Sequence, residues 1–247
     1  MKYLVMAYGF LTTLPIRSRA DYQPGDLGRA AGWYSTVGFT IGLLTAAAWW
    51  AAARFFPAPV SAFLALLVWV GLSGGLHLDG LADCCDGLLN ASSPERRLEI
   101  MKDPRLGTFG GAGLTLLLVG KYAVLMAFSY SPIPLWLIPL AAAAGRWLLL
   151  LAGFQRQARP GGMGADFALG FRKWTVAAAA IPALAGGLWA GLTGWIALGV
   201  ATLSVLLFQN AARNRLGGVT GDVMGASIEI GELAVLLTAS AVLGGGW

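Results

Sequence analysis

The stretch GGLHLDGLADCCDGLL, residues 74–89, places three aspartates within a strongly apolar sequence. If residues 78–89 form a helix, Asp79, Asp83 and Asp86 share one face, because the spacing i, i+4 and i+7 keeps them within about 60°. Like charges at this spacing repel one another, so we expect a cation against them. The apolar context favours a divalent metal ion, and an acidic helix end in solvent is the alternative.

The sequence around this stretch has the composition of an integral membrane protein. Of its 247 residues, 57% are hydrophobic and 12% are charged, and the mean hydropathy is +0.69, which is too apolar for an ordinary soluble domain of this length. Apolar runs that are long enough to cross a bilayer lie at 30–53, 60–78, 109–130, 133–152, 174–192 and 194–209, with a shorter run at 233–247.

These runs predict an all-α fold. We expect a polytopic transmembrane bundle of about seven helices, which forms a single integral membrane domain over residues 1–247. The apolar residues 1–16 predict an additional short N-terminal helix, and its sequence is compatible with an interfacial or an inserted position.

Basic residues gather in alternate loops of this predicted bundle, at 17–29, 96–105, 156–173 and 213–215. The positive-inside rule places these loops in the cytoplasm, and on this topology all twelve acidic residues fall on the same side. The net charge of +5 and the pI near 9.5 therefore indicate membrane orientation, and no nucleic acid partner is expected. Many carboxylates beside many cations favour a site for metal and phosphate at the cytoplasmic helix ends.

A second motif, MKDPRLGTFGG at residues 101–111, combines cations with glycines. A glycine-rich turn that leads into a helix offers backbone N–H groups and a positive dipole end to a phosphate. We predict a phosphate site that involves Lys102, Arg105, Gly107 and Thr108, with Asp103 as a further candidate. The alternative is a basic loop whose glycines ease the start of the next span.

A third motif, GGVTGDVMGASIEIGE at residues 217–232, carries Asp222, Glu229 and Glu232 on what can be one helical face. It is interpreted either as a polar helix start or as a second acidic face of the same site. Two acidic faces from distant parts of the sequence could then close around one metal-bound diphosphate.

Isolated polar residues give weaker signals. Lys121 and Arg146 lie inside predicted spans and need partners, so they are functional or pairing residues. His77 is a weak ligand candidate, and a structural hydrogen-bonding role is favoured for it. Asp166, in the loop RPGGMGADFALGFRK, is interpreted as a solvated loop acid.

The three motifs, together with GFLTTLPIR at residues 9–17, resemble the cobalamin synthase family, the adenosylcobinamide-GDP ribazoletransferases of bacterial and archaeal vitamin B12 assembly. The resemblance covers the chain from end to end in the family's order. It implies a membrane enzyme that joins adenosylcobinamide-GDP to α-ribazole or α-ribazole phosphate, releases GMP and requires Mg²⁺.

The family's motif pattern maps onto these acidic and basic residues, and the chemistry of the residues suggests their roles. Metal ligands are expected among Asp79, Asp83, Asp86, Asp222 and Glu229, and the general base is expected to be Asp83 or Asp86, with Asp79 also catalytic. Secondary candidates are Asp103, Glu232, Lys121, Arg146 and His77. The expected location is the cell inner membrane, with the site on the cytoplasmic face. Besides substrates and lipid, a homo-oligomer or a complex with other late corrinoid enzymes is compatible with the family.

Three other functions are alternatives to this one. A CDP-alcohol phosphotransferase also uses membrane-embedded aspartates, but its signature continues from Asp-Gly with Ala-Arg, and DGLADCCDG lacks that arginine. A cation transporter would be expected to carry carboxylates near the bilayer midplane. A non-catalytic membrane scaffold would not need carboxylates stacked on one helical stripe.

Overall fold

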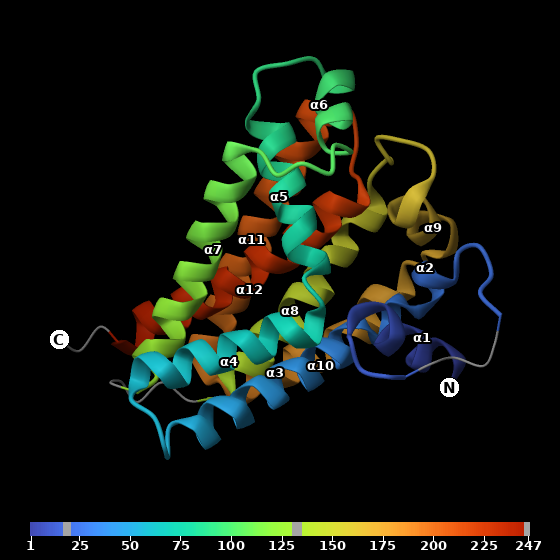
Figure 1. Ribbon diagram of the computed structural model, residues 1–247. Coiled ribbons are helices and arrows are strands. Elements are labelled where there is room, and N and C mark those ends of the chain that lie inside the picture. The colour runs from blue at the N-terminus through green and yellow to red at the C-terminus, as the bar shows by residue number, and fades with distance from the viewer. Residues whose placement is uncertain (17–20, 130–134, 245–247) are drawn as a thin grey trace.

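The computed structural model describes residues 1–16, 21–129 and 135–244, and these fold into a helical bundle (Figure 1). The start of the first basic loop and the end of the run at 233–247 lie outside the described residues. Apart from one isolated bridge between Gln157 and Val219, the described part contains no β-structure. The helices are α1 (Lys2–Leu11), α2 (Asp26–Ala30), η1 (Ala31–Trp33), α3 (Tyr34–Ala52), α4 (Ala58–Ser73), α5 (Leu76–Leu89), α6 (Pro94–Ile100), α7 (Thr108–Ala127), α8 (Leu137–Leu148), η2 (Leu149–Phe154), α9 (Gly162–Gly170), α10 (Trp174–Trp189), α11 (Gly191–Leu216) and α12 (Gly221–Gly244).

The number of membrane spans is close to the prediction. Within the described residues, five helical segments are long and apolar enough to cross a bilayer: 26–52, α7, α8 with η2, α11 and α12. The pair α4 and α5 makes a sixth if the two count as one broken span, and α10 is a shorter apolar helix of 16 residues. The prediction of an all-α polytopic bundle is confirmed.

The N-terminal helix α1 is too short to span, because its ten residues extend only about 15 Å. It packs against α2 and α3 instead. The Lys2 ammonium lies 2.9 Å from the carboxylate of Asp26 in α2, and this aspartate is fully buried. The ion pair therefore ties α1 to the bundle.

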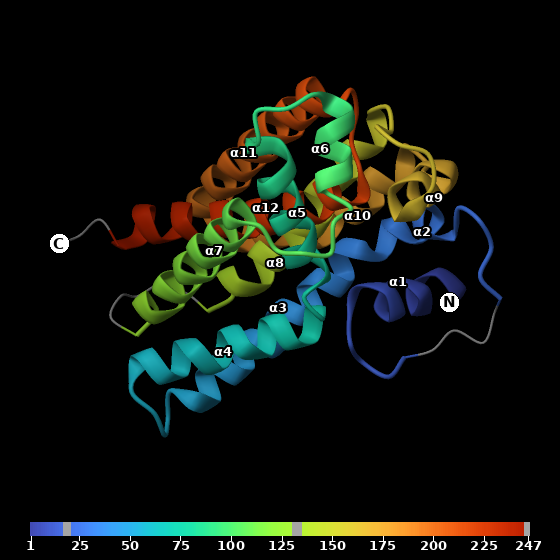
Figure 2. The same ribbon diagram turned by 45° about the horizontal axis from the view of Figure 1, so that its top comes forward.

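The predicted span at 60–78 is interrupted. Gly74 and Gly75 have φ angles of 65° and 72°, a left-handed conformation that glycine adopts without strain. The chain turns there by 89° between α4 and α5, and α5 rises away from α4 in both side views (Figures 1 and 2). The predicted aspartate helix is thus confirmed as α5, a separate helix and not the end of a straight span.

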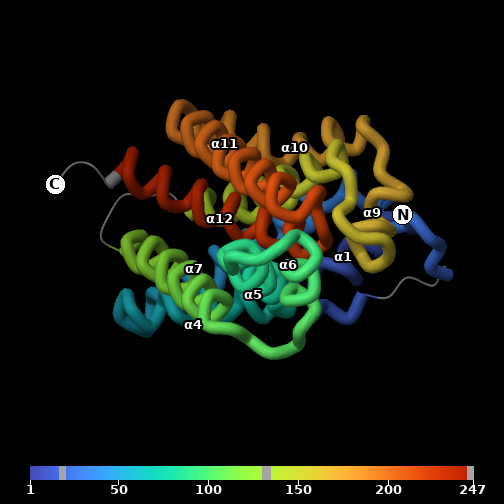
Figure 3. Tube along the Cα trace, turned by 90° about the horizontal axis from the view of Figure 1, so that it is seen from above, coloured from blue at the N-terminus to red at the C-terminus, as the bar shows by residue number. Residues whose placement is uncertain are grey.

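Helices α1, α2, α5, α6 and α9 gather at one end of the bundle, at the top and right of Figure 1. The turn between α3 and α4 and the end of α12 lie at the opposite end, at the lower left. Seen from above, α5 and α6 lie next to each other (Figure 3), and α5 also contacts α7 and α12. The helices that carry the three sequence motifs therefore meet at one end.

Helix α8 forms the centre of the bundle, and residues 137–144 are completely buried. Its tightest contact is with α3, where glycines let the two backbones touch. A Cβ atom on Gly38 would lie 2.3 Å from the carbonyl oxygen of Ala142, and one on Gly42 would lie 2.4 Å from Cα of Pro139. Small residues of this kind are the usual means of close helix packing in membranes.

We predict that Gly42→Ala destabilises the protein by about 1–3 kcal/mol, because the added methyl group forces α3 and α8 apart. The matched control is Gly199→Ala, since a Cβ there meets no atom within 4 Å and alanine is the better helix former. Thermal unfolding of the purified protein in detergent measures both. Equal unfolding temperatures for the two variants would contradict the packing argument.

Candidate active site

The start of α12 packs directly on α5, and this contact brings acidic residues from two motifs together. A Cβ atom on Gly80 would lie 2.9 Å from the carbonyl oxygen of Asp222. Asp79 and Asp222 line the same cavity, and the charges of Asp222, Asp79 and Asp86 all act on Asp83. Asp79 is exposed, whereas Asp83 and Asp222 are half-buried. Sequence motifs that lie about 140 positions apart thus supply one acidic site.

The cation of this site is Arg159, which the sequence analysis had not selected. Its Nη2 donates to a carboxylate oxygen of Asp222 at 2.9 Å, and its charge also acts on Asp83. Its Nη1 is buried and has no hydrogen-bond partner among the described residues. Arg159 is followed by glycines in RPGGMG, and the same combination of cation and glycines predicted the phosphate site around Lys102. This pattern could have identified Arg159 as well.

A backbone bridge holds the Arg159 loop in place. The amide of Ala158 donates to the carbonyl oxygen of Val219 at 2.8 Å, and the amide of Val219 donates to that of Arg156 at 2.9 Å. This short pairing joins the loop before α9 to the loop before α12. Arg159 and Asp222 are therefore positioned by neighbouring backbone segments.

Asp86 has a different environment from Asp79 and Asp83. Its two carboxylate oxygens accept hydrogen bonds from the amides of Gly107 and Gly110, at 2.8 and 2.9 Å. The glycine-rich N-terminus of α7 thus binds the carboxylate of Asp86 in the place expected for a phosphate. Thr108 is exposed in the same turn. Asp86 caps α7, which is the role of a carboxylate at the positive end of a helix.

Lys102 and Arg105 are exposed near this turn. The guanidinium of Arg105 lies 2.6 Å from Asp103, and its hydrogen bonds hold the pKa of Asp103 at about 2. Arg105, Asp86 and Thr108 line an open groove of about 570 Å³. The phosphate-binding role of this loop stays a prediction, and its cations lie where an anionic substrate could reach them.

Asp166 is not the solvated loop acid that the sequence suggested. Its carboxylate accepts hydrogen bonds from the amides of Gly25 and Leu27, at 2.6 and 3.3 Å. These amides belong to the first turn of α2, so Asp166 connects α9 to α2. That earlier interpretation was wrong because the partner lies about 140 residues away.

The comparisons with known proteins agree with these motifs. The model of the cobalamin-5-phosphate synthase family matches residues 3–240. The chain belongs to this family. Relatives named adenosylcobinamide-GDP ribazoletransferase are 38% identical in Stutzerimonas stutzeri (95% of this chain, 96% of the relative), 36% in Geotalea daltonii (99% of each) and 40% in Pseudomonas savastanoi pv. phaseolicola (94% and 96%). No solved structure matches the chain.

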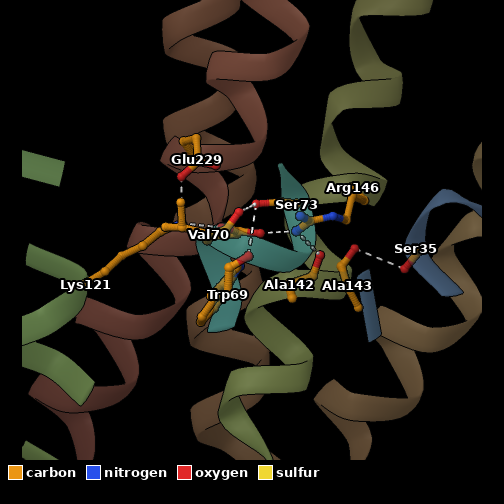
Figure 4. A network of polar contacts seen from close by, with 10 residues as sticks. Ser35, Trp69, Val70, Ser73, Lys121, Ala142, Ala143, Arg146 and Glu229 are labelled. Atoms are coloured by element: carbon orange, nitrogen blue, oxygen red, sulfur yellow. Dashed lines mark hydrogen bonds and ion pairs between the residues drawn. The ribbon is translucent and has the colours of Figure 1, made fainter. Parts of the chain in front are cut away.

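Below the acidic site, this cobalamin-5-phosphate synthase family member has a buried ion-pair cluster (Figure 4). The Lys121 ammonium in α7 donates to Glu229 at 2.6 Å and also to Glu232. The Arg146 guanidinium in α8 donates to Glu232 and to the carbonyl oxygen of Ala142. The four charged side chains are at most 4% exposed. The expectation that Lys121 and Arg146 have partners is confirmed.

The cluster corrects the predicted distribution of acidic residues. Helix α12 starts at Gly221, so Glu232 lies roughly 16 Å along the helix, within a span. The interpretation that all twelve carboxylates lie at the inner membrane surface is therefore wrong for Glu229 and Glu232. In this structure Glu229 is the partner of Lys121, and its role as a metal ligand stays a prediction.

His77 also differs from its expected role. It is 3% exposed, and neither of its ring nitrogens has a hydrogen-bond partner among the described residues. A purely structural histidine would be hydrogen-bonded within the fold. The hydrogen bond expected for His77 is therefore absent among the described residues.

We predict that Glu232→Gln lowers the free energy of unfolding by about 3–5 kcal/mol, because it leaves Lys121 and Arg146 with too little negative charge in a buried position. Glu99→Gln is the control, since Glu99 pairs with Arg96 at the surface and both side chains are about 65% exposed. Heat denaturation in detergent measures both variants. A normal unfolding temperature for Glu232→Gln would show that the cluster does not stabilise the bundle.

Proposed function

We propose that this chain is an adenosylcobinamide-GDP ribazoletransferase, with its active site at the end of the bundle where α5 meets α12. Family membership and the names of the relatives support this activity. The observation that carries the assignment of the site is that Asp79, Asp83 and Asp222 meet beside Arg159. Since the described parts of the basic loops lie at the same end, the positive-inside rule supports a cytoplasmic location for the site.

The acidic residues of this site fit Mg²⁺ by their chemistry. Among the described residues, no group of three His, Cys, Asp or Glu side chains forms a ready cage for a metal ion. Mg²⁺ does not require such a cage, because it is usually held by one or two carboxylates and by substrate phosphates. Asp79 and Asp222 would hold it, and when bound it would neutralise negative charge on the diphosphate.

The reaction is a displacement at the phosphorus on the corrinoid side of adenosylcobinamide-GDP. A ribose hydroxyl of α-ribazole attacks that phosphorus, its O–P bond forms, and the bond to the bridging oxygen breaks as GMP leaves. Asp83 accepts the hydroxyl proton, which relieves the repulsion among its like-charged neighbours. The protein contributes mainly position and electrostatic stabilisation.

The cations have separate tasks in this proposal. Arg159 stays next to Asp222, where it is aimed at the diphosphate and stabilises the charge that develops on the transferred phosphoryl group. Arg105 approaches from the open groove, and it and the nearby exposed Lys102 stabilise the leaving nucleotide. Arg105 then shares its hydrogen bonds between Asp103 and the substrate.

Cation transport is a weaker proposal for this fold. Glu229 and Glu232 do lie inside a span, but each is paired with a cation, and Lys121 and Arg146 match them in number. A transport site needs carboxylates whose charge is available to the transported ion. The buried cluster therefore supports a structural role.

We predict that Asp83→Asn lowers turnover at least about a hundredfold, because it keeps the size of the side chain and removes its basicity. GMP release from lipid-reconstituted protein with adenosylcobinamide-GDP, α-ribazole and Mg²⁺ measures this. Glu95→Gln, an exposed carboxylate on α6, should retain normal turnover. Near-normal turnover of Asp83→Asn would exclude Asp83 as the base, and a cytidine-containing substrate should give no product.

We also predict that chelation of divalent cations abolishes GMP release and that added Mg²⁺ restores it. The physical reason is that the carboxylates and the diphosphate are both negatively charged, so they repel each other unless a cation lies between them. Full activity after exhaustive chelation would contradict the magnesium assignment, and a circular dichroism spectrum would verify that the helices remain folded.

A further inference from the structure

A cavity of about 70 Å³ lies directly beside the acidic site. Its apolar wall comes from several helices and consists mainly of Phe10, Leu11, Tyr34, Phe167, Met224 and Ile228. One water needs roughly 10–15 Å³ of cavity volume, so the cavity has room for roughly five waters. Five waters occupy about 150 Å³ in the liquid. This is the size class of two fused aromatic rings.

One wall of the cavity carries an unsatisfied hydrogen-bonding group. His77 lines the cavity, is 3% exposed, and neither ring nitrogen has a partner among the described residues. The Tyr34 hydroxyl is already used, because it donates to the carbonyl oxygen of Leu27 at 2.9 Å. A buried imidazole without a partner is unfavourable, so its position indicates a ligand that completes its hydrogen bonds.

The cavity opens toward the proposed reaction centre. Among its lining residues, Asp79 and Met163 are exposed, and Asp222 lies at the same side. Gly221 and Gly225 contribute only backbone to the wall, so a ligand can approach α12 closely there. A molecule in the cavity would thus have its inner part against apolar side chains and its outer part beside carboxylates.

We propose that this cavity binds the aromatic base of the acceptor nucleoside, with His77 hydrogen-bonded to the free ring nitrogen of the base. The inference rests on the proposed function, and it names the part of the site that selects the acceptor. The base of α-ribazole consists of two fused rings with two methyl groups, so it is apolar apart from that nitrogen. Its ribose would lie at the mouth, where Asp79 and Asp222 meet near Asp83.

The guanine of the other substrate fits the cavity less well. Guanine carries a carbonyl group and an amino group that would need several partners, and His77 is the one unsatisfied side chain on the apolar wall among the described residues. A buried base with unpaired polar groups is rejected strongly. The apolar wall therefore discriminates between the two bases of the reaction.

The first test narrows the mouth of the cavity. Met163 is 46% exposed in α9, so Met163→Trp can be accommodated without disturbing the core. We expect it to raise the KM for α-ribazole at least about tenfold and to leave the KM for adenosylcobinamide-GDP within about twofold. Leu169→Trp, on the same helix at 63% exposure and outside the cavity, is the matched control and should change neither value.

The second test removes the hydrogen bond at the inner wall. His77→Leu keeps an apolar, similarly sized side chain and should raise the KM for α-ribazole about tenfold. An indole analogue of the acceptor has a C–H group in place of the free ring nitrogen. Wild type and variant should bind this analogue equally, whereas a structural role for His77 would leave a difference between them. Binding of each acceptor to protein in nanodiscs, without the corrinoid substrate, gives the same comparison independently of turnover.

The outcomes separate this inference from the proposed function. If the wild-type protein releases no GMP with any acceptor, the proposed function fails. If it releases GMP normally but Met163→Trp changes only the KM for the corrinoid substrate, or changes neither value, the cavity is not the acceptor site. Equal effects of both substitutions on both substrates would also overturn it.

Discussion

Two carboxylates of α12 and two cations from α7 and α8 form one buried cluster that joins these three helices. Any one of these charges alone would be very unfavourable inside a bilayer. Because Glu232 binds both Lys121 and Arg146, moving α12 by one turn, about 5.4 Å, would break the contacts to both neighbouring helices. The cluster therefore fixes the depth and the rotation of α12 within the bundle.

The cluster also positions the end of the bundle that carries the acidic site. Asp222 precedes Glu229 by seven residues, which is about 10 Å along the helix and nearly the same face. Glycines then bring two other elements to that face. Gly80 lets α5 touch the backbone at Asp222, and a Cβ on Gly164 would lie 2.7 Å from the amide nitrogen of Gly221. Repelling carboxylates can remain close because buried contacts elsewhere hold their helices.

Local patterns predicted the parts of the structure that depend on local spacing. The aspartate helix α5 followed from residues that are four and seven positions apart, and the end of the bundle where it lies followed from the loop charges. The depth of Glu229 and Glu232 in the membrane could not be predicted from local patterns. Hydropathy divides the charged segment from the apolar run after it, whereas pairing with buried cations lets both belong to one continuous helix. The missing information was the identity of the partners, Lys121 and Arg146, about 90 to 110 residues away.

The site shows the same limit. The roles of Asp86 and Arg159 depend on contacts between distant segments, with the glycines of α7 for Asp86 and with Asp222 for Arg159. Helical spacing correctly placed three aspartates on one stripe, but it could not show that the stripe faces two different neighbours. Asp79 and Asp83 lie toward α12, whereas Asp86 lies against the start of α7.

This division of the stripe has a consequence for the charge of the site. Because Asp86 is hydrogen-bonded to the positive end of α7, the acidic site consists of Asp79, Asp83 and Asp222, and Arg159 compensates one of these charges. One divalent cation would balance the remainder. In the proposed reaction the diphosphate of the substrate brings further negative charge, more than the metal ion and Arg159 together offset. The proposal assigns this charge to Arg105, which lines the adjacent groove, and to the nearby exposed Lys102.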